Sequence, residues 1–108
     1  MTLKPGEALI REGESSNELY WLVQGRLEVL KKLNGQYVQV NTIEAGELVG
    51  ELAFLDQKAR SATVKALTDC QLVKLEYKEF QEMLASQPKW MKKILLTLTT
   101  RLRKMSEI

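Results

Sequence analysis

The stretch GELVGELAFLDQKARSATV, from Gly46 to Val64, holds the residues of this chain that are best suited to chemistry. Glu51 and Arg60 stand nine positions apart in it, among small and aliphatic residues, and we expect both side chains to be buried. A buried charge is costly unless a partner satisfies it. Two solutions are open: the two side chains form a structural ion pair with each other, or both bind a small anionic ligand that carries hydroxyl groups.

If both side chains bind a ligand, the other residues of the stretch can contribute to the same site. Arg60 would hold a phosphate through its planar fork, and Glu51 would accept a hydrogen bond from a sugar hydroxyl. Gly50 would let the backbone approach the ligand closely. A helical turn over GELAFL would point its first amides at the phosphate, and the small residues Ser61 and Ala62 would add further donors. This pattern predicts a pocket for a sugar phosphate of modest charge.

The composition excludes several other kinds of site. The chain has 108 residues, no histidine and one cysteine, so we expect neither His-based catalysis nor a metal or iron–sulfur centre. Its net charge of +2 gives no electrostatic case for binding nucleic acid or a membrane surface. The N-terminal segment lacks the apolar core of a signal peptide and no apolar run approaches a membrane span. We therefore expect a cytoplasmic protein that is not an enzyme.

The elements that must position these residues divide into two parts. Up to Glu76 the chain alternates short apolar runs with glycine turns, which is typical of an antiparallel sandwich or barrel. Asn34-Gly35 predicts a type I′ hairpin turn, because both residues tolerate positive φ. The expected strands cover residues 18–25, 26–33, 36–43, 61–67 and 71–76.

The second part is helical. Helices are expected over 77–86 and 89–107, separated by Pro88, which fits the first turn of a new helix. The second helix carries a short heptad seam made of Met91, Leu95, Leu98, Leu102 and Met105. Trp90 and Ile94 lie beside this seam and are expected to pack on the barrel. Either the seam forms a weak or ligand-assisted homodimer, or it completes the core of a monomer.

Taken together, these motifs resemble the cyclic nucleotide-binding domains of catabolite activators and protein kinase regulatory subunits. The most specific match is the phosphate-binding cassette, in which GELA is followed nine residues after its glutamate by R-x-A-T. The resemblance covers roughly 4–104 in the order of the family. The matching residues are Pro5-Gly6-Glu7, Gly13, Tyr20-x-Leu-Val-x-Gly25, Gly46-Glu47-x-x-Gly50-Glu51-Leu52-Ala53 and Arg60-x-Ala62-Thr63.

The resemblance implies one mainly β domain over 1–108, with an antiparallel jelly-roll barrel (a double-stranded β-helix) over 1–76, a short cassette helix, and C-terminal helices over 77–107. It implies that Glu51 binds the ribose 2′-hydroxyl and that Arg60 binds the cyclic phosphate. The remaining implied ligand contacts are the amides near Leu52, Ala53 and Ala62, the Ser61 hydroxyl, and the aliphatic side chains of Val40 and Val49.

The resemblance also implies the ligand and the partners. Ser61 follows the cassette arginine, as in the activator branch, which favours cyclic AMP and leaves cyclic GMP as a weaker ligand; no cofactor is expected. Ser106 falls near the position that contacts the adenine, on a helix that would relay binding. The activators continue into a DNA-binding helix-turn-helix that this chain lacks, so we expect a sensor module cut from a longer protein, with its effector outside this chain, or a stand-alone binder.

Three other functions compete with a nucleotide sensor. One is a non-catalytic jelly-roll module that mediates protein contacts and uses Glu51 and Arg60 as a structural pair. A cupin-like enzyme and a haem or iron–sulfur sensor are disfavoured, because both depend on histidine or on several cysteines.

Overall fold

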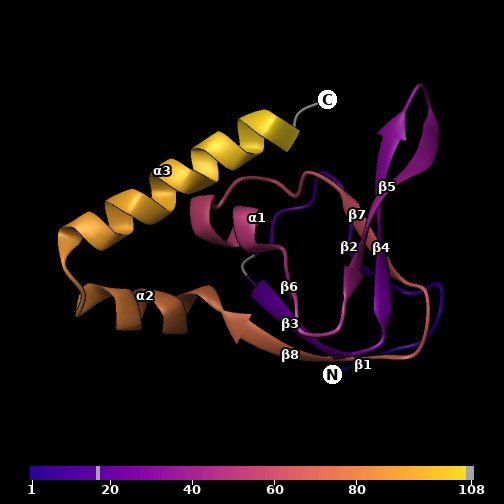
Figure 1. The fold of residues 1–108 in the computed structure, drawn as a ribbon, viewed down its shortest axis with the longest axis horizontal. Helices are drawn as coiled ribbons and strands as arrows, with labels where there is room; N and C mark the ends of the chain where they lie inside the picture. Colours follow the sequence, from indigo (N-terminus) through magenta and orange to yellow (C-terminus); the bar gives the residue numbers. More distant parts are fainter. Residues whose placement is uncertain (17, 107–108) are drawn as a thin grey trace.

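Short antiparallel strands form two four-stranded sheets in the computed structural model, which describes residues 1–16 and 18–106 (Figure 1). The first sheet has the order β1 (Thr2–Leu3), β8 (Cys70–Glu76), β3 (Glu18–Gln24) and β6 (Leu48–Val49). The second sheet has the order β2 (Ala8–Ile10), β7 (Thr63–Ala66), β4 (Arg26–Leu33) and β5 (Gln36–Glu44).

The core lies between the inner faces of the two sheets. Leu22 from β3 and Leu27 from β4 are completely buried there, with Val49, Val64 and Leu72 around them. Two facing antiparallel sheets of this kind make a jelly roll, so the predicted fold class is confirmed. The strands do not close into a single barrel, because the strands pair within each sheet and the sheets meet through side chains.

The hairpin of β4 and β5 forms where the sequence predicts it. Leu33 pairs with Gln36, and the two residues between them, Asn34 and Gly35, have φ values of 51° and 79°, as a type I′ turn requires. Farther along, the register between the two strands shifts next to Val29. This bulge leaves one extra residue on β5, and such irregularities re-aim side chains.

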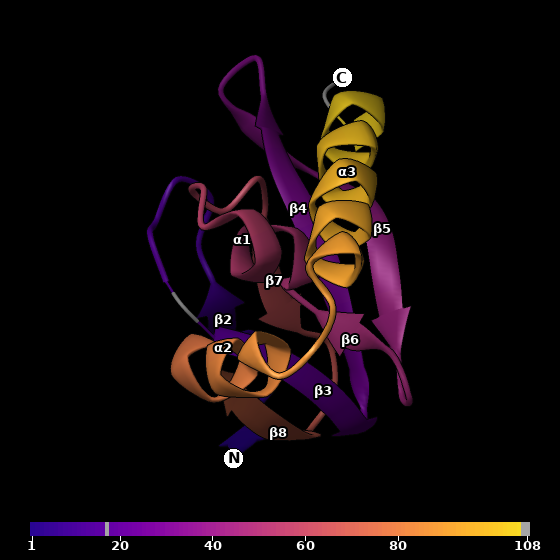
Figure 2. The ribbon, with the colours of Figure 1, turned by 90° about the vertical axis from the view of Figure 1, so that its left-hand side faces the viewer.

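Three helices complete the described chain: α1 (Glu51–Asp56), α2 (Tyr77–Ala85) and α3 (Lys89–Ser106). Helix α1 lies between the sheets and α3, and the two views agree that α1 and α3 are neighbours (Figures 1 and 2). Phe54 of α1 makes edge-on ring contacts with Tyr77 and Phe80 of α2, with centroids 5.4 and 5.1 Å apart. The two C-terminal helices thus both contact the short helix of the cassette.

The packing of α3 differs from the sequence prediction. Trp90 and Ile94 do not pack on the sheets, since they are 61% and 50% exposed. Among the residues of α3 whose side chains are described, only Thr99 is buried. The predicted seam is split: Met91 and Leu95 are half-buried, whereas the rest is exposed. The reason is that α3 turns the face of Leu95, Thr99 and Arg103 towards α1.

Candidate ligand-binding site

A cavity of about 390 Å³ opens between the sheets and α1. It is bounded by the β4–β5 hairpin, by the loop before β7 and by the first turn of α1. Nine of the ten site residues predicted from the sequence line it: Val40, Val49, Gly50, Glu51, Leu52, Ala53, Arg60, Ser61 and Ala62. The tenth, Ser106, is the last residue of α3, and its side chain lies outside the described residues.

Arg60 is the anchor of the cavity. Its side chain is 4% exposed, and the Nε–H donates to the Ser16 hydroxyl over 2.6 Å. Nη1 donates to the Gly50 carbonyl over 3.0 Å and Nη2 to the Glu18 carbonyl over 2.7 Å. Burial lowers the pKa of Arg60, against the opposing influence of Tyr20 and Glu18, but a guanidinium remains charged at any physiological pH.

The guanidinium keeps donors for a ligand. It carries five N–H groups, and three of them are used by Ser16, Gly50 and Glu18 in the described part of the chain. One N–H therefore remains on each terminal nitrogen of a side chain that lines the cavity. Two N–H groups on one rigid fork suit two oxygens of a phosphate.

Gly50 makes the position of the guanidinium possible. It has φ 83° and ψ 21° and directly precedes α1, a conformation that favours glycine. A Cβ atom at this residue would collide with Nη1 of Arg60 and would lie 3.2 Å from Cδ1 of Ile10. The absence of a side chain thus lets the arginine lie directly against the turn that begins the helix.

Glu51 departs from the expectation that it is buried. It is exposed at the cavity, as the first residue of α1, where a carboxylate stays hydrated and complements the N-terminal end of the helix dipole. No ion pair joins it to Arg60 among the described residues. The structural Glu–Arg pair considered above is therefore wrong, because Arg60 is satisfied by other oxygens.

The far wall of the cavity comes from residues that the sequence patterns did not single out. It is formed by β4 and β5, with Val29, Lys31, Asn41, Thr42 and Ile43 facing the cavity. The Asn41 side-chain oxygen accepts a hydrogen bond from the Thr42 amide over 2.8 Å. The alternation along β4 could have identified Lys31, since it lies two residues beyond Val29 on the same face.

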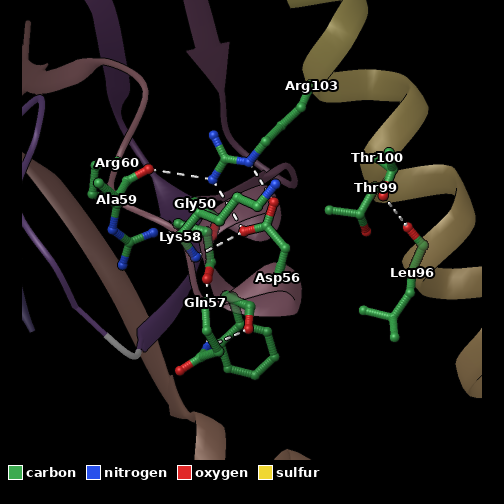
Figure 3. Close-up of polar contacts among 12 residues, drawn as sticks. Gly50, Asp56, Gln57, Lys58, Ala59, Arg60, Leu96, Thr99, Thr100 and Arg103 are labelled. Atoms are coloured by element: carbon green, nitrogen blue, oxygen red, sulfur yellow. Dashed lines mark hydrogen bonds and ion pairs between the residues drawn. The ribbon is translucent and has the colours of Figure 1, made fainter.

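A second polar cluster ties α3 to the cassette (Figure 3). Arg103 of α3 reaches Asp56 at the end of α1 through Nε and Nη2, and Nη2 also donates to the Ala59 carbonyl over 3.3 Å. The Arg103 and Asp56 side chains are only 13% and 11% exposed. The cluster thus ends at the residue that precedes Arg60, and nothing in the local sequence pattern around either residue points to it.

The described residues contain no group of three or more His, Cys, Asp or Glu side chains that could hold a metal ion. Among the same residues, no helix is both long and apolar enough to cross a membrane.

Comparison with known proteins identifies relatives over most of the chain. Residues 1–87 match the cyclic nucleotide-binding domain family. The chain is 31% identical over 101 residues to the cAMP-activated global transcriptional regulator CRP of Escherichia coli O6:H1, which covers 92% of this chain and 48% of the regulator. It is 38% identical over 82 residues to a cAMP-dependent protein kinase regulatory subunit of Yarrowia lipolytica, covering 76% of this chain and 21% of that subunit.

A solved structure agrees with these relatives. The regulatory domain of Toxoplasma gondii PKA, crystallised with cAMP, superposes with a TM-score of 0.74 at 32% identity, over 76% of this chain and 31% of that chain. The present chain spans about half the length of the bacterial regulator.

Proposed function

The chain belongs to the cyclic nucleotide-binding domain family, and on that premise we propose that it binds a cyclic nucleotide, cyclic AMP in preference to cyclic GMP, in the cavity at Arg60. The observation that carries this proposal is the buried guanidinium of Arg60, which lines the cavity and is held by three protein oxygens that use only three of its five N–H groups. A cyclic phosphate offers oxygens in the spacing that such a fork binds.

The other contacts follow from the residues around the guanidinium. Glu51 lies at the cavity next to the turn of Gly50, where its carboxylate accepts a hydrogen bond from the ribose hydroxyl. The first amides of α1, at Leu52 and Ala53, have no carbonyl of their own helix to bind, and they complete the phosphate site together with Ser61 and Ala62. Val40 and Val49 contribute apolar contacts to the nucleotide.

The first prediction is that cyclic AMP binds to the purified chain with one site and that cyclic GMP has the higher dissociation constant. Both ligands share the sugar phosphate, so the base decides. Ser61 lacks the methyl group that would restrict the rotamers of a threonine at this position, so its hydroxyl discriminates only weakly between the bases. Isothermal titration calorimetry with both nucleotides measures the two constants. A folded chain that binds neither nucleotide would refute the proposed function, and a lower constant for cyclic GMP would refute the preference.

The proposed role is regulatory and not catalytic. The curated relatives are a transcriptional regulator and a kinase regulatory subunit, and this chain covers only part of each. We infer that the nucleotide signal passes to an effector outside the chain, in the cytoplasm, without direct binding of nucleic acid or membrane by this domain. A module that only mediates protein contacts is a weaker alternative, because the ion pair on which it rested does not form.

The relay is proposed to run through α3. Arg103 connects α3 to both ends of the segment between Asp56 and Ala59, which leads directly into Arg60. A ligand that displaces Arg60 therefore also displaces the 56–59 segment, which Arg103 of α3 binds. Nucleotide binding can shift the equilibrium between two arrangements of α3 only if the nucleotide binds one arrangement more tightly than the other.

The second prediction concerns this connection. Arg103→Met is expected to lower the free energy of unfolding by about 1–3 kcal/mol, because it leaves a largely buried carboxylate without its charged partner. The matched control is Arg26→Met, which removes the 3.0 Å pair with Glu44, whose side chains are 55% and 50% exposed; such exposed pairs contribute about 0–1 kcal/mol. Urea unfolding of both variants gives the comparison, and equal losses would contradict the assignment of Arg103 as the link.

The same pair predicts a dependence on pH. Burial by itself raises the pKa of Asp56, but the hydrogen bonds from Arg103 and from the Lys58 amide, with the Arg103 charge, hold this pKa below its ordinary value of 3.8. The stabilisation is therefore complete above pH 3.8 and is lost as the pH falls through the lower pKa of the folded state. The slope of stability against pH in this acid range should be smaller in Arg103→Met than in the wild type.

The third prediction is a weak homodimer through the exposed face of α3. Trp90, Ile94 and Leu98 follow one another at intervals of four along this helix, and Leu102 and Met105 continue the stripe. Each of the five side chains is about half exposed or more, so the stripe does not complete the core of the monomer. An apolar face of this length needs a partner, and two identical stripes satisfy each other.

Leu98→Glu tests the homodimer. A charge in the centre of the stripe should shift the wild-type dimer to monomer in sedimentation velocity, while the exposed position leaves the monomer folded. Thr100→Glu is the control, since it introduces the same charge on the opposite face of α3 and should leave association unchanged. A wild type that sediments as a monomer at micromolar concentration, with and without nucleotide, would show that the dimer does not form.

A further inference from the structure

A second cavity, of about 380 Å³, is separate from most of the cavity at Arg60. In the part of the chain that the structure describes, the two cavities share only Leu48 and Glu51 as lining residues. The walls of the second cavity come from α1, α2 and α3, which lie close together in Figure 2, and from β3, β6 and β8. Its size is within the range of about 300–1,000 Å³ that is usual for small-molecule sites.

The walls of the second cavity are mainly apolar and include aromatic rings. Eight of its eleven described lining residues are leucine, methionine or phenylalanine. Phe54 of α1 and Phe80 of α2 stand edge-on to each other, with ring centroids 5.1 Å apart. Leu48, Leu75 and Met83 are exposed although they are apolar. Exposed apolar side chains that gather around a hollow indicate a site that a binding partner covers.

The strand pattern explains why apolar side chains face outwards here. Side chains alternate between the two faces of a strand, so Leu19 lies on the outer face of the first sheet, because its neighbour Tyr20 is buried in the core. Leu75 is paired with Leu19 across the two strands and shares that face. Leu48 is exposed in the same way beside the buried Val49. The outer face of a two-sheet fold is usually polar, so leucines at these positions need a further reason.

The charged residues that line the second cavity are three exposed carboxylates, Glu51, Glu76 and Glu79. Glu76 lies 4.0 Å from Lys74 in a solvent-exposed pair, and Lys74 does not line the cavity. Glu51 and Glu79 form no ion pair among the described residues. No lysine or arginine in the described part of the chain lines the cavity. Negative charge beside apolar and aromatic walls is complementary to a cation that carries an apolar body.

We propose that the second cavity binds a small amphiphilic amine, which has an apolar ring or chain and one ammonium group. The apolar body packs among Phe80, Met83 and Leu95, and the ammonium binds the exposed carboxylates, Glu79 among them. Such a ligand contacts α1, α2 and α3 together, so it stabilises one arrangement of the helices over others. This site does not depend on the binding of a nucleotide.

The test uses three probes that share a naphthalene ring and differ in charge: naphthylmethylamine, naphthylmethanol and naphthoate. Each probe is titrated into the purified, isotopically labelled chain, and amide NMR spectra give both the dissociation constant and the residues affected. Glu79→Gln removes one carboxylate of the cavity. Glu82→Gln makes the same change on α2 at an exposed residue that does not line the cavity, and it serves as the control.

The amine is expected to shift the amide signals of Leu48, Phe80 and Met83. It should bind about three- to five-fold more tightly than the alcohol, as for one solvent-exposed ion pair, and the carboxylate probe should bind most weakly. Glu79→Gln should remove most of the advantage of the amine over the alcohol. Glu82→Gln should leave that advantage unchanged, because its carboxylate lies outside the cavity.

Equal affinities for the three probes would overturn the proposal, as would the absence of binding by the amine at millimolar concentration. Equal affinity of the amine for the wild type and Glu79→Gln, or shifts confined to β4 and β5, would place the amine elsewhere and also overturn it. Signals of Leu48 and Leu75 that move with protein concentration alone would assign the cavity to a second copy of the chain, against the proposal. None of these measurements uses cyclic AMP, so their failure is distinct from failure of the proposed function.

Discussion

Replacement of Arg60 by alanine is expected to weaken binding of cyclic AMP by about 2–4 kcal/mol, because the variant leaves a desolvated phosphate without its charged partner. The structure supports a loss of this size, since the guanidinium is 4% exposed and is already fixed by three hydrogen bonds before any ligand binds. Little of the binding energy is then spent on ordering the arginine. Calorimetry of the wild type and the variant measures the difference.

Arg60→Lys separates charge from geometry. Lysine keeps the positive charge but lacks the planar fork, so it cannot replace the bonds to Ser16 and to the Gly50 and Glu18 carbonyls together with two bonds to the phosphate. We expect partial recovery of affinity, between alanine and the wild type. Circular dichroism must show both variants folded. If Arg60→Ala is folded and binds cyclic AMP as the wild type does, the phosphate site is elsewhere.

Gly50→Ala is expected to impair both stability and binding. The residue has a φ of 83°, which costs an L-residue about 1–2 kcal/mol, and the new methyl group would also collide with Nη1 of Arg60. Displacing the guanidinium breaks its alignment with the phosphate, so we expect affinity for cyclic AMP to fall at least about ten-fold, the effect of losing one charge-assisted hydrogen bond.

Gly35→Ala is the matched control for Gly50→Ala. Gly35 has a similar φ of 79° in the β4–β5 turn, and a Cβ there would meet nothing within 4 Å. In urea unfolding, both variants should show the loss of stability that an L-residue at positive φ causes. Gly50→Ala should show an additional loss of stability, and it alone should bind cyclic AMP more weakly. Equal losses of stability, with binding unchanged in both, would show that the contact between Gly50 and Arg60 is unimportant.

Much of the fold follows from local signals in the sequence. Alternation along β4 and β5, with a turn whose two residues accept positive φ, is enough to define the hairpin, because both signals act within a few residues. The resemblance to the family also identifies nine residues that line one cavity, seven of them in the cassette and the other two being Val40 and Val49. Glu51 was nevertheless expected to be buried, because its neighbours in the sequence are aliphatic; the first turn of α1 leaves it exposed at the edge of the cavity instead.

The periodicity of α3 illustrates a different limit. Spacings of three and four residues show which side chains share a face of a helix, and they predicted an apolar stripe here. They do not show which face packs against the rest of the molecule. That depends on α1, which packs against the face of α3 that carries Thr99 and Arg103, so that Trp90 and Ile94 remain exposed to solvent.

The sequence by itself therefore indicated the hairpin turn, the helices and the longer strands β3, β4, β5, β7 and β8, since each depends on residues close together in the chain, whereas the short strands β1, β2 and β6 were not predicted. Only the tertiary structure decided what holds Arg60, because its partners Ser16 and Glu18 are 44 and 42 residues away. The same is true of the link from Arg103 to Asp56 over 47 residues. These contacts form because folding brings distant oxygens to a buried guanidinium that cannot remain unsatisfied, and no local pattern specifies which oxygens those are.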